Sequence, residues 1–137
     1  MLDLYNYKST ILKVVDGDTF KIKLDLGFRF SHQTELRLLR IDTPEVKKYP
    51  GRYKYDEEIA IGKQISDWVR TRIEGREVEL QTQLDENDKY GRVLAEVFYE
   101  QENGKWVNLN QEMLDLGFDK QIIQEKLESS TTIEIPA

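Results

Sequence analysis

The run STILKVVDGDTFKIKLDL, residues 9–26, is the part of the sequence that decides the fold class. Residues 9–15 and 19–26 alternate apolar and polar side chains or carry β-branched runs, a pattern typical of strands. Asp16-Gly17-Asp18 falls between them, and Asp and Gly suit the corner of a hairpin. The sequence therefore predicts a β-hairpin near its start.

Further strand signals follow toward the C-terminus. We predict a third strand at residues 36–41, ending next to Asp42, and the segment 27–34 before it, with His32, is expected to form the hairpin end. His32 is expected to be a solvated loop residue. Two later segments, 77–83 and 93–99, also alternate well enough to be strands.

Helical spacing appears after the third strand. Apolar residues at positions 61, 65, 69 and 73 fall on one stripe, which predicts a helix over 56–73. A short helix is expected from Asn110, as its N-cap, to residue 116, and 121–128 is weakly helical. Together these elements predict a mainly β fold with α: a five-stranded OB-fold Greek-key barrel, one longer helix after strand 3 and a short C-terminal helix.

Composition limits the domain count and the kinds of site. With 137 residues the chain is expected to form one domain over 1–128, followed by a flexible tail at 129–137. There is no cysteine, which excludes disulfides and thiolate metal sites, and the single histidine excludes multi-histidine zinc sites. The acidic, weakly apolar N-terminus predicts a cytoplasmic protein without a membrane segment, with secretion still open if a leader was removed.

Charge is unevenly distributed along the chain. The formal net charge is −6, which by itself disfavours avid non-specific binding of nucleic acid. Basic residues nevertheless concentrate between positions 37 and 54 and at 89–92, whereas acids dominate 96–112. A basic face on an acidic protein is therefore expected.

Three short segments carry the chemistry. They are Asp16-Gly17-Asp18-Thr19, the run RLLRIDTPE at 37–45, and the run DKYGR at 88–92. The aspartates offer an oxygen-only shell that suits Ca²⁺ or Mg²⁺. EF-hand spacing fails from residue 16 and from residue 85, because the required Glu or Gly is missing.

Three further side chains complete a phosphodiester site. The guanidinium forks of Arg37 and Arg92 match phosphate oxygens, and Glu45 could activate or orient water. Each residue taken singly is more simply an ordinary turn, loop or surface side chain. The three segments together are the set that a metal-assisted phosphodiester hydrolase needs.

Over residues 10–120, which is most of the chain, these segments resemble the staphylococcal nuclease (thermonuclease) family. They occur in the same order as in that family. The resemblance implies an OB-fold nuclease that uses Ca²⁺ to hydrolyse DNA and RNA. It implies metal binding by Asp18, Asp42 and the carbonyl of Thr43, with Asp16 as a nearby acidic partner. It assigns phosphate binding to Arg37 and Arg92, a general-base or water-orienting role to Glu45, and the nucleotide site to Lys89 and Tyr90.

Three features depart from the family pattern. Ile123 and Glu125 stand where the family has a pair of tyrosines that pack on a base, and the long C-terminal helix is shortened. The segment 26–34 also looks longer than in the type member.

The sequence thus predicts a Ca²⁺-dependent nuclease of low sequence specificity that prefers single strands, with no membrane or protein partner inferred. The alternatives are a non-catalytic nucleic-acid-binding OB-fold module and a protein-interaction domain with an acidic cleft. Retention of Arg37, Glu45 and Arg92 favours the enzyme.

Overall fold

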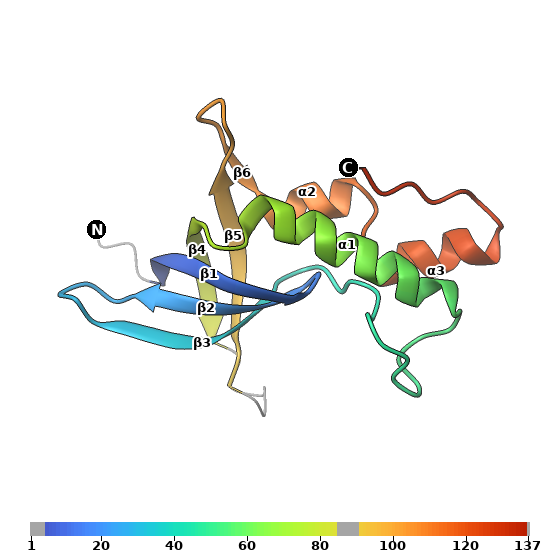
Figure 1. Ribbon diagram of the computed structural model, residues 1–137, viewed down its shortest axis with the longest axis horizontal. Helices are drawn as coiled ribbons and strands as arrows, with labels where there is room; N and C mark the ends of the chain where they lie inside the picture. The colour runs from blue at the N-terminus through green and yellow to red at the C-terminus, as the bar shows by residue number, and fades with distance from the viewer. Residues whose placement is uncertain (1–4, 85–90, 137) are drawn as a thin grey trace.

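Five strands close into a barrel (Figure 1). The computed structural model describes residues 5–84 and 91–136, excluding the side chain of residue 84. The barrel strands are β1 (Asn6–Asp16), β2 (Thr19–Asp25), β3 (Ser31–Leu38), β4 (Glu77–Leu84) and β5 (Val93–Glu100). Neighbours pair antiparallel in the order β3-β2-β1-β4-β5, and a parallel β3–β5 ladder closes the ring. The predicted OB-fold barrel is confirmed.

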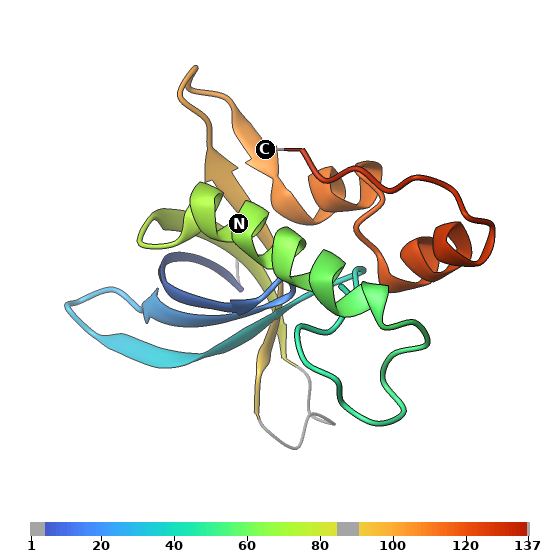
Figure 2. The same ribbon diagram turned by 45° about the vertical axis from the view of Figure 1, so that its right-hand side comes forward.

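Three helices lie together on one side of the strands (Figures 1 and 2). They are α1 (Glu57–Ile73), α2 (Leu109–Asp115) and α3 (Lys120–Glu128). A short β6 (Trp106–Asn108) pairs with β5, and the sequence patterns did not predict it. Within residues 5–84 and 91–136, no helix has both the length and the apolar character needed to span a membrane.

The core joins the barrel interior to the helix layer. Phe20, Ile22 and Leu36 are fully buried inside the barrel, because every second residue of a strand faces inward. From α1, Trp68 packs edge-on against the ring of Phe118, with centroids 5.1 Å apart. Residues 65, 69 and 73 of the predicted stripe are also buried. Ile133 and Ile135, beyond α3, pack against this core as partly buried side chains. The domain boundary at residue 128 stays a prediction.

The third strand differs from its prediction. It covers Ser31–Leu38 rather than 36–41, so His32 lies within β3, opposite Leu24, and not in the hairpin end. The strand begins earlier than predicted because its polar start, although exposed, pairs fully with β2. At the other end Arg40 has φ 70°, which breaks extended structure. Asp42 therefore lies in a loop rather than at the end of the strand.

The N-cap of α2 is also displaced from its prediction. The Asn108 side chain accepts a hydrogen bond from the Gln111 backbone N–H, which makes Asn108 the cap. Asn110 is instead fully buried. Its amide oxygen accepts from Val97 N, and its amide nitrogen donates to the Leu39 and Ala95 carbonyls. Asn110 therefore ties α2 to β5 and to the loop after β3.

Candidate active site

A polar cleft of about 370 Å³ lies where the β1–β2 corner, the loop after β3 and the start of α3 meet. Seven residues that the sequence predicted as site residues line it. They are Asp16, Asp18, Arg37, Asp42, Thr43, Glu45 and Arg92. The structure therefore gathers side chains from positions 16 to 92 around one hollow.

The Asp-Gly-Asp corner holds one carboxylate rigidly. Asp18 is 7% exposed, and its Oδ2 accepts a hydrogen bond from Thr43 N at 3.0 Å. Its other oxygen, Oδ1, accepts from Thr19 Oγ1 at 3.1 Å, while Asp16 Oδ1 accepts from Asp18 N. Gly17 is required by this close approach, since a Cβ there would lie 2.8 Å from Thr43 Oγ1. The corner thus packs directly on the loop that carries the other site residues.

That loop, residues 39–45, is held at Arg40 and at Asp42. Arg40 donates from Nε to Glu96 Oε1 at 2.6 Å, which anchors the residue with the left-handed backbone. Asp42 N donates to Asp119 Oδ1 at 3.2 Å, and Lys120 N donates to the Asp42 carbonyl at 2.7 Å. The N-terminal end of α3 therefore sets the position of Asp42.

Arg37 lies between the two predicted metal-binding carboxylates. Its Nη2 is 3.1 Å from Asp42 Oδ1 and 3.5 Å from Asp18 Oδ2, and its Nη1 donates to the Leu38 carbonyl at 3.1 Å. Because both carboxylates reach the same nitrogen, their oxygens converge on a space that one positive charge occupies. Arg92, half-buried, lines the same cleft.

Glu45 pairs with a lysine that the sequence motifs did not single out. Lys120 Nζ is 3.6 Å from Glu45 Oε1, and both side chains are less than a fifth exposed. The sequence does not predict Lys120 as a site residue, because it follows Glu45 by 75 positions and belongs to no recognised motif. Arg52 also lines the cleft, and it belongs to the basic segment between positions 37 and 54.

Several carboxyl groups lie close together in the cleft. Burial, followed by the hydrogen bond and charge of Asp18, raises the pKa of Asp16 to about 8. Burial and then the Asp18 charge also raise the pKa of Asp42, against the opposing pull of Arg37 and Lys120. Carboxylates with raised pKa values in one hollow favour a proton or a cation there.

The donor set fits a hard cation. Asp18 and Asp42 offer carboxylate oxygens, and Thr43, which is buried, lines the same cleft and donates its backbone N–H to Asp18. Across the described residues, no group of three or more Asp, Glu, His or Cys side chains forms a ready metal cluster. A cation here would therefore depend on backbone oxygen and water to complete its shell.

The remaining residues singled out in the sequence are the predicted nucleotide-binding pair and the two positions at which the family has tyrosines. Lys89 and Tyr90 lie outside the described residues. Ile123, at one family tyrosine position, is 1% exposed and belongs to the core, while Glu125 lies exposed on α3. The segment that follows Phe118 is thus helical and presents no aromatic ring at these two positions.

The barrel and its cleft define a class: an OB-fold domain with an arginine set among carboxylates. The family model described as "Staphylococcal nuclease homologue" matches residues 35–135, and this chain belongs to that family.

Several curated proteins are similar to this chain in sequence. An uncharacterized protein of Methanocaldococcus jannaschii is 30% identical over 82% of this chain and 58% of its own length. Endonuclease YhcR of Bacillus subtilis is 31% identical over 75% of this chain and 8% of its own length. A thermonuclease of Staphylococcus hyicus is 34% identical over 64% of this chain and 46% of its own length. The chain thus spans less than two thirds of these curated relatives.

Proposed function

We propose that this chain is a Ca²⁺-dependent nuclease that hydrolyses phosphodiester bonds of DNA and RNA with little sequence specificity. The observation that carries the proposal is the convergence of Asp18 and Asp42 on one Arg37 nitrogen. Family membership and two relatives named as nucleases support the same reaction class.

Ca²⁺, held by Asp18, Asp42 and the Thr43 carbonyl, would supply positive charge against a phosphate oxygen and lower the pKa of bound water. Arg37 and Arg92 then neutralise the negative charge that grows on the phosphate oxygens. Glu45 accepts the proton of the attacking water, and the Lys120 ammonium, 3.6 Å away, keeps this carboxylate oriented.

The proposed reaction is hydrolysis of the bond between phosphorus and the 5′ oxygen. The water oxygen forms a bond to phosphorus, the bond from phosphorus to the 5′ oxygen breaks, and that oxygen gains a proton. The products are a 3′-phosphate and a 5′-hydroxyl. Single strands are the preferred substrate, because an unpaired backbone can bend into a cleft of this size.

The test is cleavage of a labelled single strand in Ca²⁺, repeated in EGTA, with two variants. Arg37→Lys keeps the charge but loses the planar fork, and Glu45→Gln removes the proton acceptor. Loss of one such donor costs roughly 10²–10³ in turnover. Glu128→Gln, an exposed residue of α3 outside the cleft, is the matched control.

Wild-type cleavage that needs Ca²⁺, with both cleft variants folded but crippled, supports the assignment. Calcium-dependent cleavage that survives in both variants would refute these residue roles. Strand binding without any cleavage would favour the non-catalytic OB module, and no strand binding at all would favour a protein-interaction domain.

A further inference from the structure

The hairpin between β2 and β3 carries the most exposed aromatic side chains among the described residues. Phe28 is 96% exposed and Phe30 is 71% exposed, with Leu26 beside them at 47%. This tip lies at the opposite end of β2 from the cleft, because Thr19 lines the cleft and Asp25 ends the strand. Six steps along a strand separate the two by roughly 20 Å.

The backbone of the tip is strained. Phe30 N donates to the Gly27 carbonyl at 2.9 Å, so residues 27–30 form a tight turn. Its two central residues, Phe28 and Arg29, have φ of 51° and 69°, in the left-handed region that side chains other than Asn, Asp and Gly disfavour. Asn-Gly would make this turn with less strain. The turn therefore presents an aromatic ring and a guanidinium at a conformational cost.

Positive charge connects the tip with the cleft. Lys21 and Lys23 both lie on the solvent face of β2, between buried residues. Lys13 of β1 is paired in register with Lys21, and like charges directly opposite each other repel. A polyanion that lies along β2 relieves this repulsion.

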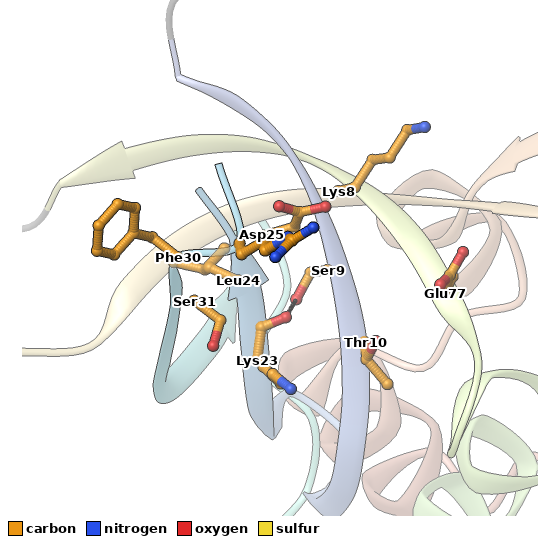
Figure 3. Close-up of a pocket in the computed structure, with 10 residues that line it drawn as sticks. Lys8, Ser9, Thr10, Lys23, Leu24, Asp25, Phe30, Ser31 and Glu77 are labelled. Carbon is orange, nitrogen blue, oxygen red and sulfur yellow. Dashed lines mark hydrogen bonds between the residues drawn. The ribbon is translucent and has the colours of Figure 1, made fainter. Parts of the chain in front are cut away.

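A hollow of about 280 Å³ at the base of the hairpin adds to the same face. Lys8, Lys23, Arg29 and Phe30 are among its lining residues, and Figure 3 shows the Phe30 ring pointing away from the strands. Acids also lie on this face: Asp25 and Glu77 line the hollow, and Glu35 is opposite Lys21. Asp25 is partly engaged, since its Oδ1 accepts from Gly27 N at 2.9 Å.

We propose that the β2–β3 hairpin and the lysines of β2 form a second binding site for single-stranded nucleic acid, distinct from the cleft. Unpaired bases stack on Phe28 and Phe30, and Arg29, Lys23 and Lys21 contact successive phosphates. The strand then runs along β2 to Thr19, which is paired with Arg37 at the cleft. The identification of the polyanion rests on the proposed function.

The alternation of rings and cations favours a nucleic acid over the other occupants of an exposed apolar tip. A single strand offers phosphates to the lysines and flat bases to the rings at the same time. A lipid surface would need only the tip, and it would make no use of Lys21, which lies on the solvent face of β2 towards the cleft.

The experiment measures binding of a fluorescent oligothymidylate of about 15 nucleotides in EGTA, where the proposed catalysis is switched off. Phe28→Ser combined with Phe30→Ser is expected to weaken binding about fivefold or more, the lower end for loss of base stacking. Trp106→Ser, which removes an exposed aromatic ring on β6, is the matched control and is expected to bind as wild type.

Two further variants separate a binding role from a structural one. Phe28→Asn with Arg29→Gly should raise the melting temperature, because it relaxes the turn, while it weakens binding. Lys21→Gln with Lys23→Gln should lower the slope of log affinity against log salt by about 0.7 per lost phosphate contact. A turn variant that is more stable and binds as tightly as wild type would overturn the proposal.

The remaining outcomes also decide the matter. On a stable duplex of the same length the serine variants should lose much less affinity, because paired bases hide their faces; an equal loss would refute stacking. Sedimentation with phosphatidylserine vesicles that needs Phe28, together with unchanged oligonucleotide binding, would assign the tip to a membrane surface and reject the proposal. Failure of the proposed function shows separately, as strand binding without Ca²⁺-dependent cleavage.

Discussion

Gly62 is the residue of α1 on which the position of Glu45 depends. A Cβ at this position would lie 2.4 Å from the Glu45 carbonyl oxygen and 2.7 Å from that of Pro44. Both atoms belong to the backbone, so no side-chain rotation can relieve the contact. Gly62→Ala therefore forces the loop that carries Glu45 away from the helix by at least about 0.6 Å, merely to reach 3.0 Å.

The expected cost falls on activity more than on stability. Replacing glycine with alanine inside a helix gains about 1 kcal/mol in propensity, while the overpacking costs about 1–3 kcal/mol. The free energy of unfolding should therefore fall by about 0–2 kcal/mol. Displacement of a catalytic group by about 1 Å costs on the order of 10² in rate, so we expect roughly a tenfold to hundredfold loss of cleavage.

The assay pairs a urea unfolding curve with the Ca²⁺-dependent cleavage rate. Gln64→Ala, at an exposed position two residues further along the same helix, is the control and should change neither quantity much. A folded Gly62→Ala variant that cleaves at nearly the wild-type rate would refute the link between this contact and the position of Glu45.

Two other outcomes follow from the same geometry. The raised pKa of Asp16, about 8 against 3.8 when unfolded, means that its proton stabilises the folded state: this contribution is full below pH 3.8 and is lost as the pH rises toward 8. The free energy of unfolding of the metal-free protein, measured in urea, should thus fall between pH 3.8 and pH 8. Asp16→Asn should fall less over this range, and a variant with the same pH dependence as wild type would contradict the burial of this carboxyl. Asn110→Ala leaves the backbone N–H of Val97 and the carbonyls of Leu39 and Ala95 without this hydrogen-bond partner. The free energy of unfolding in urea should fall by roughly 2–4 kcal/mol. A loss below about 1 kcal/mol would show that water replaces the amide.

Local patterns accounted for most elements of the barrel. Alternation predicted β1, β2, β4 and β5 because each has one face in the core and one in water, and the stripe on α1 marked its buried side. Patterns failed where pairing, not hydrophobicity, makes a strand. The polar start of β3 is held by backbone bonds to β2, and the short β6 by backbone bonds to β5, without an alternating apolar face to mark either strand.

The sequence by itself determined which residue types are available for chemistry. The order of these residues indicates a site of carboxylates and an arginine; they are Asp16, Asp18, Arg37, Asp42 and Glu45. Their roles stay predictions, but their gathering in one cleft does not depend on any role.

Only the tertiary structure decided how these groups meet. It places Arg37 between two carboxylates, pairs Glu45 with Lys120 across 75 positions, and assigns Asn110 to the core rather than to a helix cap. The physical reason is that barrel closure by β3 and β5, and docking of α3 on the loop after β3, are long-range contacts. Such contacts leave no periodic signal in the chain, because each depends on where two distant segments end in space.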